Sequence, residues 1–162
     1  MSSNVSGASG AAERSHGRSD LLQKAAQAVG AVFLLVGILG FIPGITANFD
    51  EMKFAGHESG AELLGIFQVS VLHNIVHLLY GVAGLALART WNGARNYLIG
   101  GGVIYLVLFL YGLLFANDMT AANFVPLNTA DNWLHFFLGV GMIAIGVLLS
   151  KKDRDNSTTA RR

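Results

Sequence analysis

Two matching segments contain the residues of this sequence whose types and spacing could do chemistry. Residues 74–82 read NIVHLLYGV and residues 132–140 read NWLHFFLGV, so both follow the pattern N-x-x-H-x-x-x-G-V. Because residues three, four and seven positions apart lie on one side of a helix, we expect Asn74, His77 and Gly81 to share a stripe. The equivalent residues of the second segment are Asn132, His135 and Gly139.

Haem of the b type is one candidate cofactor for this pattern. Two imidazoles from different helices can bind the haem iron from its two sides. His77 and His135 are the candidate ligands, and Gly81 and Gly139 would leave room for the macrocycle. The chain has no cysteine, which excludes covalently attached haem, thiolate metal sites and disulfides.

A transition metal is the second candidate. His73 precedes His77 by four residues, a spacing that places two imidazoles on the same side of a helix. His135 could complete a set of three nitrogen ligands. The sequence contains no H-E-x-x-H motif, since position 74 is asparagine, and it predicts no set of catalytic residues.

A polar cluster without a cofactor is the interpretation that we prefer. Counted along the helices from the basic residues at their inner ends, the histidines reach the outer half of the membrane, and Tyr111 reaches the same depth. Asn74 and Asn132 extend this cluster. Polar side chains inside membrane proteins hydrogen-bond across helices, so the cluster is expected to serve packing or to bind a small ligand.

Four long apolar segments must position these residues. Of the 162 residues, 52% are hydrophobic and 13% are charged, whereas an ordinary soluble domain has about 25% charged residues. The apolar segments are long enough to cross a hydrocarbon core of about 30 Å as helices. The predicted fold is all-α, a four-helix transmembrane bundle built from two tandem helical hairpins. The predicted spans are residues 25–42, a part of 63–88, 96–116 and 132–150.

The distribution of charge predicts how the chain is threaded. Ten of the eleven lysines and arginines lie before the first span, between the second and third spans, or after the fourth. The positive-inside rule then places both termini in the cytoplasm, with the acidic connections outside and solvated. Residues 1–23 are predicted to be a disordered cytoplasmic tail, 24–150 the membrane domain, and 151–162 a basic cytoplasmic tail.

The same charge pattern limits the partners. The lipid bilayer is the predicted environment, and the low content of charged residues, which avoid the long apolar segments, excludes nucleic acid as a partner. A homo-oligomer or a second membrane protein stays open as a partner, because the sequence contains no feature that decides between them.

Four segments of the chain have a distinctive composition: GFIPG at 40–44, LGIFQVSVLHNIVH at 64–77, ANFVPLN at 122–128 and DNWLH at 131–135. In these segments the chain resembles the bacterial four-span membrane family catalogued as domain of unknown function 4383. With the spans, the resemblance covers residues 24–150. It implies four helices in a bacterial cytoplasmic membrane. It implies no activity, because the family has no assigned one, so the expectation is an integral membrane protein of unassigned biochemical function.

Overall fold

The computed structural model describes residues 6–115, 125 and 127–159, and side chains from residue 21 to residue 150 within these ranges. The chain is mostly helical, and the predicted all-α fold is corrected by a small sheet. The elements are α1 (Ser6–Leu39), β1 (Thr46–Ala47), a short 3-10 helix (Phe49–Glu51), β2 (Glu62–Leu63), β3 (Phe67–Gln68), α2 (Val71–Leu87), α3 (Trp91–Phe115) and α4 (Thr129–Thr159).

Three of the helices are long and apolar enough to cross a membrane. The segments that meet both conditions are Leu21–Leu39 of α1, Trp91–Phe115 of α3 and Thr129–Ser150 of α4. Helix α2 is apolar but has 17 residues, which cover about 26 Å. Large apolar side chains such as those of Leu79 and Phe137 are about two-thirds exposed. A lipid bilayer solvates such surfaces, so the helices indicate a membrane environment.

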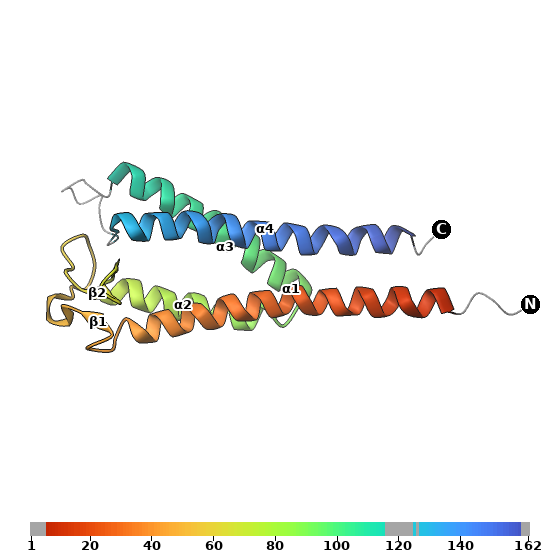
Figure 1. Ribbon diagram of the computed structural model, residues 1–162, viewed down its shortest axis with the longest axis horizontal. Helices are drawn as coiled ribbons and strands as arrows, with labels where there is room; N and C mark the ends of the chain where they lie inside the picture. The colour runs from red at the N-terminus through yellow and green to blue at the C-terminus, as the bar shows by residue number, and fades with distance from the viewer. Residues whose placement is uncertain (1–5, 116–124, 126, 160–162) are drawn as a thin grey trace, which may run out of the picture.

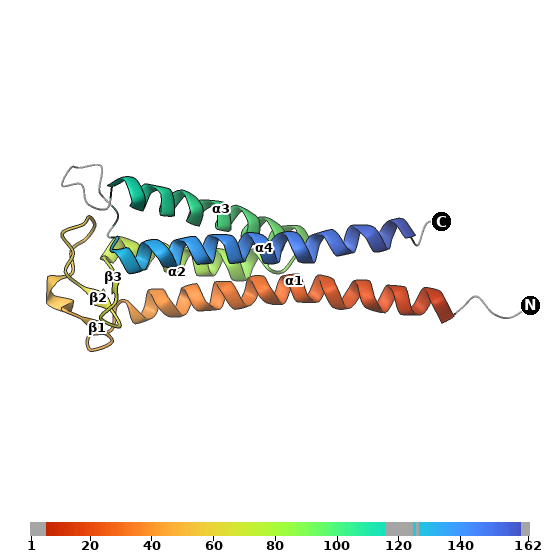
Figure 2. The same cartoon turned by 45° about the horizontal axis from the view of Figure 1, so that its top comes forward.

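The helices lie in two antiparallel pairs. Helix α1 packs along α2, and α3 packs along α4, whereas α2 and α3 contact each other much less (Figure 1). The start of α1 and the end of α4 lie at one end of the long axis, and the strands lie at the other (Figure 2). We call the latter the sheet end of the molecule.

The connection between α1 and α2 forms a three-stranded antiparallel sheet in the order β1-β2-β3. Leu63 of β2 is opposite both Thr46 and Phe67, and its side chain is buried with Ala61 and Val69. From the sequence, this region was predicted only as a solvated acidic connection. Each strand has two residues, which is too short to show the alternation of polar and apolar residues that reveals a strand.

Helix α2 lies within the predicted range of residues 63–88, and α1 and α4 extend beyond the predicted spans at the ends near the two termini. Helix α2 begins at Val71, because the side chain of Ser70 accepts a hydrogen bond from the backbone N–H of His73 at 3.2 Å and caps the helix. Helices α1 and α4 extend over residues 6–23 and 151–159, which lie within the two predicted tails. The rest of both predicted tails lies outside the described residues.

Candidate functional site

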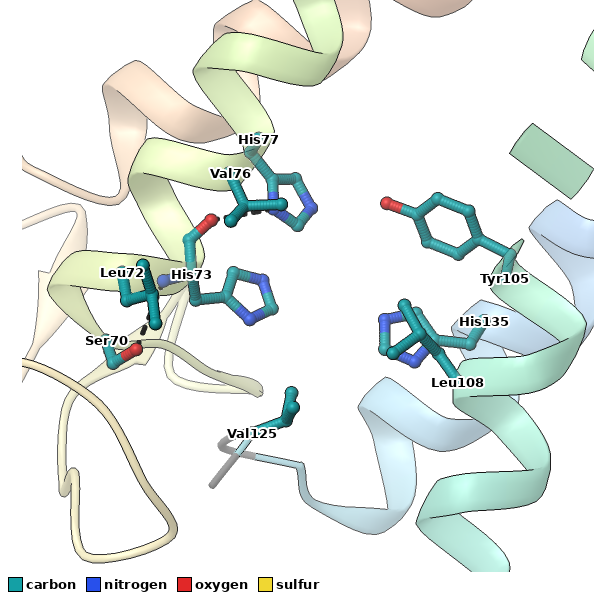
Figure 3. Close-up of a pocket in the computed structure, with 9 residues that line it drawn as sticks. All are labelled: Ser70, Leu72, His73, Val76, His77, Tyr105, Leu108, Val125 and His135. Atoms are coloured by element: carbon teal, nitrogen blue, oxygen red, sulfur yellow. Dashed lines mark hydrogen bonds between the residues drawn. The ribbon is translucent and has the colours of Figure 1, made fainter. Parts of the chain in front are cut away.

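A cavity of about 150 Å³ lies between α2, α3 and α4 at the sheet end of the molecule (Figure 3). Apolar side chains form much of its wall. The polar residues that line it are Ser70, His73, His77, Tyr105 and His135. All three histidines proposed as ligands therefore line the same cavity.

Helix α2 supplies two of the three imidazoles. His73 and His77 are one turn apart, and their rings are stacked with centroids 4.3 Å apart and an interplanar angle of 12°. Nδ1 of His77 lies 3.1 Å from the carbonyl oxygen of His73. A carbonyl oxygen only accepts hydrogen bonds, so Nδ1 donates and carries the proton. In the neutral ring, the remaining nitrogen of His77, Nε2, is then a hydrogen-bond acceptor.

The opposite wall of the cavity comes from α3 and α4. His135 and Tyr105 are 4% and 6% exposed, and their rings meet edge to face with centroids 5.1 Å apart. In Figure 3 the hydroxyl group of Tyr105 points across the cavity towards His77. Within the described residues, Nδ1 of His135 is buried and has no hydrogen-bond partner. The described residues therefore leave one buried nitrogen of this wall without a hydrogen bond.

The three histidines do not converge as metal ligands. Within the described part of the chain, no group of three His, Cys, Asp or Glu side chains is placed to hold a metal ion. The physical reason is the stacking of His73 on His77, since parallel rings direct their nitrogens side by side and not towards a common point. His135 lies on the opposite wall (Figure 3).

The two glycines proposed as space for a haem lie in contacts between helices. A Cβ atom added to Gly81 would lie 2.6 Å from the backbone nitrogen of Leu34 and 2.8 Å from the carbonyl oxygen of Gly30, both in α1. A Cβ atom added to Gly139 would lie 2.9 Å from the carbonyl oxygen of Gly102 in α3. Both glycines thus permit the close approach of paired helices, and neither lines the cavity.

The asparagines of the two matching segments also lie between paired helices. Asn74 packs against Gly40, which directly follows α1, and a Cβ atom at Gly40 would overlap the Asn74 side chain. Asn132 packs in the same way against Gly112 of α3. Their side chains are 1% and 8% exposed. The asparagines therefore contribute to helix packing and lie apart from the cavity-lining residues.

The tyrosine at the cavity is Tyr105 and not Tyr111. Tyr111 lies one turn before Phe115, with ring centroids 5.1 Å apart, and is not among the residues that line the cavity. Counting residues from basic side chains predicts depth only if all helices start at one level. Residues 30–40, GAVFLLVGILG, align with 102–112, GVIYLVLFLYG, and pair Tyr105 with Phe33. The significance of this pairing comes from the structure, in which the ring of Phe33 contacts His77.

Comparisons with known proteins give one match. The family described as domain of unknown function 4383 matches residues 23–148, which is more than half of the chain. A search of the curated proteins and a search of the solved structures found no match.

Proposed function

We propose that this chain, which belongs to the family of domain of unknown function 4383, is a four-span protein whose histidine-lined cavity binds a small uncharged ligand. In this proposal residues 24–150 form the membrane domain, in a bacterial cytoplasmic membrane with both termini inside. The path of α2 supports the fourth crossing, because it runs from the sheet end to the level of Gln23 in α1, whose side chain donates a hydrogen bond to the carbonyl oxygen of Ala88 (Figure 1). Its length of about 26 Å is close to the thickness of a hydrocarbon core.

We further propose that the two helix pairs are copies of one hairpin. In the first pair Gly30 contacts Gly81, and in the second pair Gly102 contacts Gly139. The first helices of the two pairs thus correspond at an offset of 72 residues, from 30 to 102, and the second helices at 58, from 81 to 139. The contact of Asn74 with Gly40 and the contact of Asn132 with Gly112 are related by the same two offsets.

Aromatic contacts and helix caps follow the same offsets. Phe33 lies 5.4 Å from His77 between ring centroids, and the equivalent residues, Tyr105 and His135, lie 5.1 Å apart. Ser70 caps the start of α2, and Asn128, 58 residues later, accepts a hydrogen bond from the backbone of Asp131 in the same geometry. A duplicated hairpin accounts for all of these pairs.

The polar side chains that line an otherwise apolar cavity are the observation that carries the proposal of a ligand. An apolar pocket with a few convergent polar groups is the usual form of a small-molecule site. Among the described residues that line the cavity, none is Asp, Glu, Lys or Arg. An uncharged ligand is therefore favoured over an ion.

The cavity favours a small ligand over the alternative of a membrane redox component with a haem or a metal. Its volume of about 150 Å³ is below the range of about 300–1,000 Å³ that is typical of sites for drug-sized molecules. The glycines that would have made room for a macrocycle are in contact with α1 and α3. The proposed function is therefore binding, without catalysis and without a resident cofactor.

Filling the cavity tests this proposal. Phenol and indole, added to the purified protein in lipid nanodiscs, are expected to raise the temperature of unfolding progressively, with the logarithm of their concentration once it exceeds the dissociation constant. Leu108→Trp fills the cavity and should abolish the rise. Val107→Trp, a change at a neighbouring position that is 58% exposed and does not line the cavity, should retain it. No stabilisation of the wild type, or equal stabilisation of Leu108→Trp, would contradict the proposal.

The absorption spectrum tests the alternative. We expect the purified protein to lack a Soret band and to contain no stoichiometric transition metal. A Soret band or a bound metal that is lost in both His77→Ala and His135→Ala would replace our proposal with the redox alternative.

A further inference from the structure

We propose that the cavity binds the ring of a phenol or hydroquinone lipid, whose hydroxyl group donates a hydrogen bond to His77 and whose apolar tail stays in the bilayer. This inference rests on the proposed ligand-binding function and names the class of its ligand. Three independent features of the cavity support it: a fixed acceptor, walls made of rings, and an opening towards lipid.

The fixed acceptor is Nε2 of His77. Because Nδ1 of this residue donates to the carbonyl oxygen of His73 at 3.1 Å, the neutral ring has only a lone pair left to offer. The ring of His77 borders the open space of the cavity (Figure 3). A ligand must therefore bring an O–H or N–H group to this side. A hydroquinone has such a group, whereas the corresponding quinone has only acceptors.

The opposite wall can hold a second oxygen. The hydroxyl group of Tyr105 donates and accepts, and neutral His135 has one nitrogen of each kind. Both residues lie across the cavity from His77 (Figure 3). Polar groups on two facing walls suit a ring with oxygen atoms at opposite edges.

Imidazole and phenol rings form part of the cavity walls, and the volume of the cavity is sufficient for one further ring. The imidazoles of His73 and His77 are stacked, and those of Tyr105 and His135 meet edge to face. Such surfaces pack well against another aromatic ring, which gains about 0.5–1.5 kcal/mol per pair beyond its burial. The cavity measures about 150 Å³, and an engineered cavity of about this size in another protein binds benzene.

The cavity opens towards the lipid between α2 and α3. Val76 lines the cavity and is also 52% exposed, so it forms the rim of the opening. Helices α2 and α3 contact each other much less than the members of each pair do. In a bilayer the exposed side of Val76 faces acyl chains. An amphiphile could thus place its ring in the cavity from within the membrane while its tail remains among the lipids.

A matched pair of probes tests the inference on the wild-type protein. Decyl-para-hydroquinone, kept reduced by excluding oxygen, is titrated into nanodiscs that contain the protein. Its dissociation constant, expressed as the ratio of probe to lipid, is compared with that of its dimethyl ether. We expect the ether to bind at least tenfold more weakly, because it cannot donate to His77, and tenfold corresponds to about 1.4 kcal/mol. Tyr105→Phe should weaken binding of the hydroquinone about fivefold. Tyr97→Phe, the same change at a tyrosine of α3 outside the cavity, should leave it unchanged.

Several outcomes would overturn the inference. Equal affinity of the hydroquinone and its ether would remove the role of His77 as acceptor. Equal affinity of tailed and tail-less hydroquinone would show a ligand that enters from water. If decyl-para-hydroquinone fails to bind while phenol still stabilises the wild type but not Leu108→Trp, this inference is wrong and the proposed function stands. Failure of both probes would overturn both.

Discussion

The two helix pairs, α1–α2 and α3–α4, are alike along the lines where their helices touch and differ where they face each other. In each pair, glycines allow close approach and an asparagine packs against a glycine near the sheet end. On the cavity side, the first pair has Phe33 beside His77 and the second has Tyr105 beside His135. The retained glycines and asparagines therefore serve packing, the retained histidines line the cavity, and the positions that differ distinguish the two walls of the site.

A second difference lies at the starts of α2 and α4. His73 lines the cavity, whereas the equivalent residue of the second pair, Asp131, binds the sheet. Its Oδ2 accepts hydrogen bonds from the backbone N–H groups of Gln68 at 2.9 Å and Asn128 at 3.1 Å. One position has thus acquired two roles, one at the cavity and one in fastening the strands to α4.

The largest effect should come from the glycines that the two pairs share. Gly81→Val and Gly139→Val would each force a side chain against backbone atoms of the neighbouring helix. We expect each to lower the free energy of unfolding by about 3 kcal/mol, measured by reversible unfolding in detergent. Gly141→Val is the control, since a Cβ atom there has no neighbour within 4 Å. A large effect in only one pair would break the proposed equivalence of the pairs.

A smaller and more local effect is expected where the pairs differ at the sheet end. Asp131→Ala removes a buried carboxyl group that accepts two backbone hydrogen bonds, and an intramolecular hydrogen bond contributes about 0.5–1.5 kcal/mol. The amide of Gln68 should exchange its hydrogen about tenfold faster or more. Asp50→Ala, at an exposed position of the same connection, should not change this rate. Unchanged protection of Gln68 in Asp131→Ala would show that the sheet does not depend on α4.

The smallest effect on stability is expected at Tyr105. Tyr105→Phe makes the second pair resemble the first, and it removes a hydroxyl group that points into the cavity (Figure 3). The free energy of unfolding should change by less than about 0.5 kcal/mol, even though ligand binding weakens. A loss of more than about 1 kcal/mol would mean that the hydroxyl group serves packing and would contradict the assignment of this difference to binding.

Long apolar runs and the repeated histidine motif were sufficient to predict most helices and three of the residues that line the cavity. The direction of the individual side chains was harder to predict. Since a helix advances by about 100° per residue, His77 points about 60° away from Asn74, whereas Gly81 points only about 20° away. This difference puts Asn74 and Gly81 against α1 and turns His77 towards the cavity. A motif that looks like one stripe therefore serves two neighbours.

Tyr105 and the sheet could not be predicted for different reasons. The position of Tyr105 depends on which helices pair and at what height, and these are properties of tertiary packing. The strands depend on hydrogen bonds between short segments, such as Val69 N–H to the carbonyl oxygen of Ala61 at 2.9 Å. Such contacts leave no periodic trace in the sequence.

The hydrogen bond from Gln68 to Asp131 joins the first helix pair to the second at the sheet end. At the other end of α2, only residues 88–90 separate α2 from α3, so the pairs are tethered there as well. Because both ends of α2 are fastened to the second pair, the two pairs cannot swing apart as rigid bodies. We expect a guest to enter through the opening beside Val76, and its rate of entry to depend on small movements of α2 and α3 against the surrounding lipid.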